Sequence, residues 1–328
     1  MTRKLIIFLF CSHYLVLCLL AQKTEDKYHV NLMGRPPDVL VIERIFQKPD
    51  ISDGDPASGK LVRQYLPEYK GTEVHHLLFL PENWETDKKY PVIIEYNGNG
   101  SLVDQTGANG YGISGGKDYI WAVLPFVNED KRTETDWWWG KKENTVDYAK
   151  KAIPAICEAW GGDKDRVVLT GVSRGAIACN YIGLHDDEIA DLWAAMVPVS
   201  HYDGRLDWRW EMSKEDAYRA AERVKRLGDT PQLICGEYHL RENHTDANDL
   251  KAVREGSYTD MEVAIKELDL IPQSESEGIR DFISEHYPEG NIIFIDLPFV
   301  NHTNAWLFMN VPEREMVRSW LNEVLDRN

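Results

Sequence analysis

Cysteine is scarce in this sequence, and no tract of it is repetitive. Five of the 328 residues are cysteines, and two of these lie in an apolar stretch at the N-terminus. Beyond that stretch only Cys157, Cys179 and Cys235 are left, an odd number that excludes a complete disulfide framework. All three lie in apolar segments, which predicts buried free thiols. No cysteine spacing is typical of a zinc site, and we expect neither a metal ion nor a cofactor.

Basic residues are also in deficit. The chain has 37 lysines and arginines against 54 aspartates and glutamates, a formal net charge of −17. Phosphate groups repel a chain this acidic, so nucleic acid and anionic membrane surfaces are poor partners. Hydrophobic residues make up 43% of the chain, enough for a full core, which argues against disorder.

The longest apolar run lies at the N-terminus. Arg3 and Lys4 precede residues 5–20, and Ala21 offers a small residue for cleavage. This order is typical of a signal peptide, and the run is short for a membrane span, which needs about 20 apolar residues. We therefore predict a signal peptide over residues 1–21 and a secreted or periplasmic protein. An uncleaved membrane anchor is the alternative.

Strand-like and helix-like segments alternate along the rest of the chain. Residues 22–70 are polar, contain several prolines and glycines, and predict an extended arm. Apolar segments rich in β-branched residues then predict strands, at residues 75–80, 90–96, 119–124, 166–170, 192–199, 232–235 and 292–295. Helices are expected over residues 144–160 and 213–227, with two more between 246 and 290. Buried strands separated by helices predict an α/β fold, a mostly parallel sheet covered on both faces, within one domain over residues 71–328.

One pentapeptide has the pattern Gly-x-Ser-x-Gly, and it is Gly171-Val172-Ser173-Arg174-Gly175. An apolar strand precedes it and a helix-compatible run, residues 176–182, follows. In this setting the pattern presents a serine on a sharp turn, where the glycines avoid clashes and the helix N-terminus favours negative charge. We predict that Ser173 is a nucleophile. A structural serine at a helix start is the alternative.

A nucleophilic serine requires a histidine base and a carboxylate that orients it. His302 follows the last predicted strand and lies in the segment Asn301-His302-Thr303-Asn304, ahead of a final helix. We predict His302 as the base, with an ordinary surface histidine as the alternative.

On these residues the chain resembles the α/β-hydrolase esterases of the feruloyl esterase, acetylxylan esterase and polyhydroxybutyrate depolymerase type. The resemblance covers about residues 75–325. It is carried by residues 78–83, by Asn97-Gly98-Asn99-Gly100, by residues 161–176 and by the His302 segment. It implies an α/β-hydrolase fold and ester hydrolysis by a Ser–acid–His triad through an acyl-enzyme.

The acid is where the chain departs from these esterases. They usually have Gly-x-x-Asp after the penultimate strand, whereas here Gly236 is followed by Glu237, Tyr238 and His239. Glu242 lies slightly further along the same loop and is our first choice. Glu237 and Asp203 are the alternatives.

The remaining site residues are predicted from their residue types and their places along the chain. The oxyanion hole is expected from the backbone N–H of Arg174 and from the loop that contains Gly98 and Asn99. Substrate is expected to contact four further side chains, namely Trp139, His201, Tyr202 and Trp306.

Trp139 ends the run Trp137-Trp138-Trp139, and Trp208 and Trp210 lie further along the chain. Exposed tryptophan faces suit sugar rings or aromatic acyl groups, which favours an ester on a small molecule or a decorated polysaccharide. The alternative is that the tryptophans pack in the core.

Three Asn-x-Ser/Thr sequons occur, at Asn99, Asn243 and Asn301. Glycans on two or three of them would enter the predicted site, so either they are unmodified or the site is misplaced. A serine peptidase of the same fold and an inactive, carbohydrate-binding hydrolase-like module are alternative functions. The sequence gives neither the natural ester nor the oligomeric state.

Overall fold

The computed structural model describes residues 27–133, 139–203 and 214–326. The predicted signal peptide therefore lies outside the described residues, as do Trp137, Trp138, Trp208 and Trp210. Within the described ranges, no helix is long and apolar enough to cross a membrane.

The centre of the molecule is a nine-stranded sheet with the order β1-β2-β3-β5-β4-β6-β7-β8-β11. Its strands are β1 (Ile51–Ser52), β2 (Leu61–Gln64), β3 (His76–Phe79), β4 (Tyr90–Tyr96), β5 (Ile120–Leu124), β6 (Gly162–Val172), β7 (Ala195–Val199), β8 (Gln232–Gly236) and β11 (Ile292–Asp296). The six strands from β5 to β11 pair in parallel, and within this sheet only β3 runs opposite to the others. The prediction of a mostly parallel sheet is confirmed.

The sheet begins earlier in the chain than the sequence indicates. β1 and β2 belong to the segment predicted as an extended arm, and β2 pairs antiparallel with β3. The boundary at residue 70 is therefore wrong. Strands of two and four residues are too short to show a periodic pattern, and they acquire their ladder partner only when the chain folds back onto β3.

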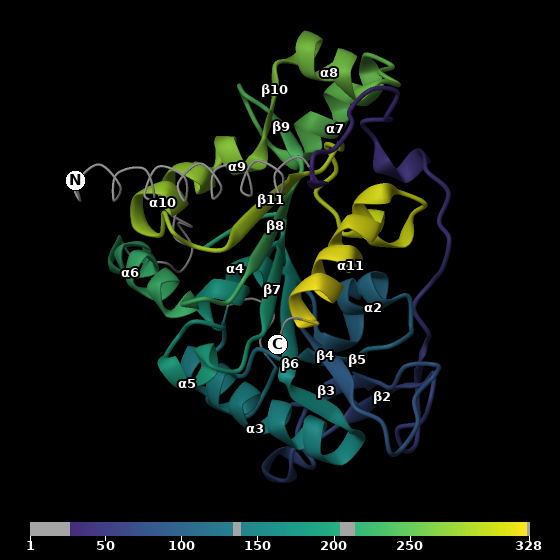
Figure 1. The fold of residues 1–328 in the computed structure, drawn as a ribbon, viewed down its shortest axis with the longest axis vertical. Coiled ribbons are helices and arrows are strands. Elements are labelled where there is room, and N and C mark those ends of the chain that lie inside the picture. The colour runs from purple at the N-terminus through teal and green to yellow at the C-terminus, as the bar shows by residue number, and fades with distance from the viewer. Residues whose placement is uncertain (1–26, 134–138, 204–213, 327–328) are drawn as a thin grey trace, which may run out of the picture.

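Helices cover both faces of the sheet (Figure 1). α3 (Lys142–Trp160) and α4 (Arg174–Tyr181) pack their apolar residues into one core, while α2 (Asn109–Ser114) and α11 (Pro312–Leu325) pack into a second core on the opposite face. α3 accommodates Pro154 and ends at Gly161, whose φ of 75° provides the left-handed residue that closes many helices. α5 (Asp187–Ala190) and α6 (Lys214–Val224) complete the helices before β8.

The chain between β8 and β11 forms a satellite beyond one edge of the sheet, at the top of Figure 1. β9 (Tyr238–Leu240) and β10 (Leu270–Pro272) pair antiparallel, and α7 (Asp246–Glu255) and α8 (Met261–Leu268) pack on them around a small core of their own. α9 (Gln273–Ser276) and α10 (Ile279–His286) follow. The sequence predicted two helices over residues 246–290, whereas the described chain forms four helices and a strand there.

The prediction of buried free thiols is confirmed. Cys157, Cys179 and Cys235 are all unpaired and buried. Burial raises the pKa of the Cys157 thiol to about 11, so it remains protonated at neutral pH.

Candidate active site

Ser173 lies on a sharp turn between β6 and α4. Its φ of 56° and ψ of −121° lie in a region that side chains other than glycine rarely adopt. A Cβ on Gly171 would lie 2.3 Å from Gly175, and a Cβ on Gly175 would lie 2.0 Å from the Tyr96 carbonyl oxygen. Both glycines are therefore required by contact, and together they hold the serine at the strained turn that the sequence predicted.

The strands that carry the site end in one row at their carboxyl edge. Val172 of β6 lies opposite Val199 of β7, and Val199 lies opposite Cys235 of β8. Cys235 in turn lies opposite Ile295 of β11. The Ser173 N–H donates to the Val199 carbonyl oxygen at 3.0 Å. Residues that directly follow these strands therefore meet at one edge, the place where parallel α/β sheets bind ligands.

Glu237 and His302 form an ion pair at this edge. His302 Nδ1 lies 2.6 Å from Glu237 Oε1, although the two residues are 65 positions apart in the chain. The Glu237 side chain is buried at 1% exposure, and that of His302 is 17% exposed. Ser200, directly after β7, donates its hydroxyl to Glu237 Oε2 at 2.5 Å. Both carboxylate oxygens of Glu237 are thus engaged, which fixes the orientation of the imidazole.

The pair shifts the pKa of both partners. Burial alone would raise the pKa of Glu237, but the charge and hydrogen bond of His302 lower it to about 2. Burial alone would lower the pKa of His302, but the charge and hydrogen bond of Glu237 raise it to about 9. Glu237 therefore carries a negative charge at neutral pH and stabilises a positively charged His302.

The expected contact between Glu242 and His302 is wrong. Glu242 is exposed in the loop between β9 and α7, and the carboxylate on His302 belongs to Glu237. Glu237 directly follows Gly236, the last residue of β8, so its side chain starts at the carboxyl end of the strand. Glu242 lies beyond β9, which carries the chain away from that edge.

Asp203, the third candidate acid, belongs to a different pair. Arg223 donates to both of its carboxylate oxygens, at 2.7 and 3.0 Å. The two side chains are only 2% and 9% exposed. The Arg223 guanidinium also lies 4.6 Å from the centre of the Tyr181 ring. Asp203 therefore anchors α6 to the body of the fold.

Asp203→Asn is expected to lower the free energy of unfolding by about 3–5 kcal/mol, because it removes the Asp203 charge from its contact with the buried Arg223 guanidinium. Urea unfolding at neutral pH measures this. Asp187→Asn is the control, since Asp187 is 91% exposed in its pair with Arg226 and its loss should cost under about 1 kcal/mol. Equal losses in the two variants would contradict a structural role for Asp203.

His201, predicted to contact substrate, lies beside His302. Its ring centre is 4.7 Å from that of His302, and its Nδ1 lies 2.6 Å from Glu277 Oε1. Gln273 donates to the same Glu277 oxygen at 2.9 Å. No local pattern in the sequence pointed to Glu277 or Gln273, because both come from the α9 region and reach the site only through the packing of the satellite.

Trp139, Tyr202 and Trp306 are not cleft residues. Trp139 is 5% exposed and stacks on Tyr181 at 4.7 Å between ring centres. Tyr202 and Trp306 are each 1% exposed and belong to apolar cores. Their prediction as substrate-binding residues is wrong. Tryptophan and tyrosine side chains have a large apolar area, and these three bury it in the cores on the faces of the sheet.

The loop after β4 lies against the Ser173 turn. A Cβ on Gly98 would be 3.8 Å from the Ser173 Cβ, so the backbone of Gly98 borders Ser173. The buried side chain of Arg174 reaches this loop and donates to the Ser101 carbonyl oxygen at 3.4 Å. Asn99 is exposed, and its side chain accepts from the Gly100 N–H. The loop and the start of α4 therefore lie together, as an oxyanion hole requires.

The asparagine of one of the three sequons forms hydrogen bonds inside the fold. Asn301 is 6% exposed, accepts from the Val39 N–H at 2.7 Å and donates to Asp38 at 2.9 Å. An asparagine with both ends of its amide bonded inside the fold cannot present a nitrogen for glycosylation. Asn99 and Asn243 are exposed.

No protein-family model matches this chain, and no curated protein matches it in sequence. Solved structures do match. A candidate dipeptidyl aminopeptidase IV from Bacteroides ovatus aligns with a TM-score of 0.50 and 13% identity, over 82% of this chain and 35% of its own. A thermostable esterase aligns at 0.46 and 15%, over 80% and 62% of the two chains, and a ferulic acid esterase at 0.48 and 12%, over 81% and 97%.

The chain thus spans about three fifths of the thermostable esterase and about a third of the aminopeptidase. At these identities the similarity concerns the fold. The strand order, the strand–turn–helix at Ser173 and the alignment at a TM-score of 0.50 together confirm the predicted α/β-hydrolase fold.

Proposed function

We propose that this protein is a serine hydrolase that cleaves carboxylic esters, with Ser173 as nucleophile, His302 as general base and Glu237 as the acid of the triad. The observation that carries the proposal is the buried Glu237–His302 pair, on the sheet edge where the Ser173 turn ends β6. A serine on a strained turn and a histidine held by a buried carboxylate are the parts that acyl transfer requires.

Each residue has a defined step in this reaction. His302 in its neutral form takes the proton from the Ser173 hydroxyl as the serine oxygen attacks the ester carbonyl carbon, so the rate should rise as pH rises toward the raised pKa of His302. Glu237 holds the imidazole and stabilises its positive charge, while the backbone N–H groups of Arg174 and Gly98 face the developing oxyanion. Collapse of the tetrahedral intermediate releases the alcohol, which receives the proton from His302, and water then hydrolyses the acyl-enzyme by the same route.

The choice of an ester over a peptide bond rests on the sequence resemblance, because the triad serves both reactions. The described tryptophans do not support a polysaccharide-linked ester as the substrate. Two of the tryptophans that suggested a sugar-binding surface, Trp139 and Trp306, are buried.

The test is a fluorophosphonate probe and two chromogenic substrates applied to the folded full chain. We expect covalent labelling, hydrolysis of p-nitrophenyl acetate, and slower cleavage of dipeptidyl p-nitroanilides. Faster cleavage of the anilides would make the protein a peptidase. If the protein showed no labelling and no turnover, the inactive binding module would be the better hypothesis.

We also propose that the chain is exported, on the N-terminal basic–apolar–small pattern alone. N-terminal sequencing of the protein recovered from its native host is expected to begin near Gln22. A chain that still begins at Met1 would contradict cleavage.

A further inference from the structure

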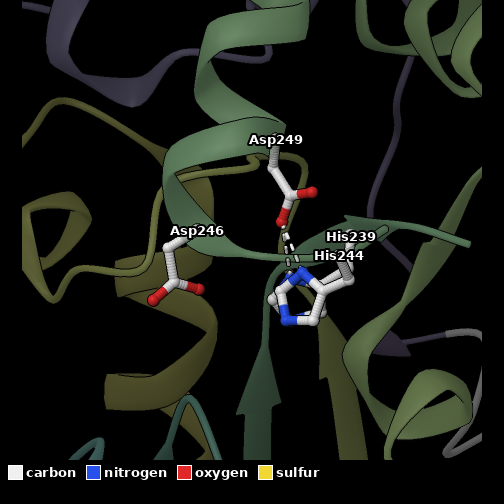
Figure 2. Close-up of side chains that lie close together, drawn as sticks. All are labelled: His239, His244, Asp246 and Asp249. Carbon is white, nitrogen blue, oxygen red and sulfur yellow. Dashed lines mark hydrogen bonds and ion pairs between the residues drawn. The ribbon is translucent and has the colours of Figure 1, made fainter. Parts of the chain in front are cut away.

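A second group of ionisable side chains lies next to the Glu237–His302 pair. It consists of His239 on β9, His244 in the loop that follows, and Asp246 and Asp249 in the first turn of α7 (Figure 2). One nitrogen or oxygen from each of the four lies within 4.8 Å of those from the other three. The four come from eleven consecutive residues, so the segment that runs from β9 through a loop into α7 gathers them.

Asp249 holds both imidazoles. Its Oδ2 lies 3.0 Å from His239 Nδ1 and 2.7 Å from His244 Nδ1, as the dashed lines in Figure 2 mark. Its Oδ1 accepts from the Leu240 N–H at 3.1 Å. The two ring centres are 3.8 Å apart. Asp249 therefore holds both imidazoles close to its own carboxylate, so these three candidate donors are already gathered without an ion.

Burial makes His239 hard to explain as an ordinary polar residue. The side chains of His239 and Asp249 are both 0% exposed. His239 Nε2 has no hydrogen-bond partner among the described residues, and a buried polar atom without a partner is costly and rare. A nitrogen left free beside a held imidazole is available to coordinate an ion.

The site is also open to solvent on one side. The His244 side chain is 32% exposed, and Asp246 is exposed at the start of the helix. His244 and Asp246 therefore border solvent, and an ion can approach the two buried side chains from that side.

We propose that His239, His244, Asp246 and Asp249 bind one divalent transition-metal ion, zinc by the chemistry of the donors. Imidazole nitrogen with carboxylate oxygen suits zinc and its neighbours, whereas calcium and magnesium take oxygen donors. Two carboxylates balance the charge of a divalent cation. The sequence predicted no metal ion, because no cysteine spacing is typical of a zinc site. The proposed site has histidine and aspartate donors instead.

The site adjoins the triad. Asp246 also lies within 4.8 Å of ligand atoms of Glu237 and His302, and His239 is two residues from Glu237 in the chain. An ion at this place would fix the start of α7 against the segment that carries Glu237. Metal binding is nevertheless measured directly, so the inference stands or falls separately from ester hydrolysis.

The test is binding of zinc chloride to the full chain after dialysis against a chelator, by titration calorimetry and by elemental analysis after gel filtration. We expect one equivalent of zinc and a raised Tm. His244→Ala and Asp246→Asn are each expected to weaken zinc binding by at least about 100-fold, because each removes one of four donors.

Two variants serve as matched controls. His286→Ala removes a histidine that is also 32% exposed, on α10, and Asp281→Asn removes an acid from the first turn of that helix. Both should bind zinc as the wild type does. Failure of the wild type to bind zinc, unchanged binding in both cluster variants, or tighter binding of calcium than of zinc would overturn the proposal.

Discussion

Ser173→Ala is expected to lower kcat/KM for p-nitrophenyl acetate by at least about 10⁴-fold and to abolish fluorophosphonate labelling. The substitution removes the attacking oxygen, and removal of a serine nucleophile in enzymes of this mechanism costs about 10⁶-fold in kcat. The residual rate would come from the oxyanion hole and from substrate binding alone. Alanine fits the position without a clash, because it only shortens a side chain at the edge of the sheet.

Ser257→Ala is the matched control for this variant. Ser257 has the same φ of 56° as Ser173 but lies exposed after α7, so any effect of alanine on a strained turn should appear in both. The control should keep wild-type activity and labelling. A Ser173→Ala protein that remained labelled would place the nucleophile elsewhere.

Glu237→Gln is expected to lower kcat by about 10³–10⁴-fold. Glutamine keeps the shape of the side chain but removes the charge that stabilises the protonated His302 and holds its tautomer. The equivalent change in a serine protease costs about 10⁴-fold. KM should change little, since Glu237 is buried behind the histidine. Steady-state kinetics with p-nitrophenyl acetate separate the two constants.

Glu242→Gln is the matched variant, the same chemical change five residues along. Because Glu242 is exposed and His302 is already bonded to Glu237, its kcat should stay within about threefold of the wild type. A large loss of kcat in Glu242→Gln with a small loss in Glu237→Gln would instead support Glu242, the acid first predicted from the sequence. Far-UV circular dichroism and thermal melting of both proteins would show that they are folded.

Local features were predictable because short segments determine them. The strand–turn–helix at Ser173 is formed by consecutive residues. Its two glycines, Gly171 and Gly175, are required because a Cβ on either would clash with neighbouring backbone atoms. The β-branched runs gave seven of the central strands for the same reason. The three buried thiols follow from apolar neighbours in the chain.

The sequence by itself therefore determined the strand–turn–helix that carries Ser173, the place of His302 after the last strand, and the fold class. Only the tertiary structure decided which carboxylate meets His302, because that contact joins residues 65 positions apart and depends on how β8 and β11 align. It also decided that Trp139 and Trp306 are core residues. A side chain's partners are set by the packing of distant segments, which residue type and spacing do not encode.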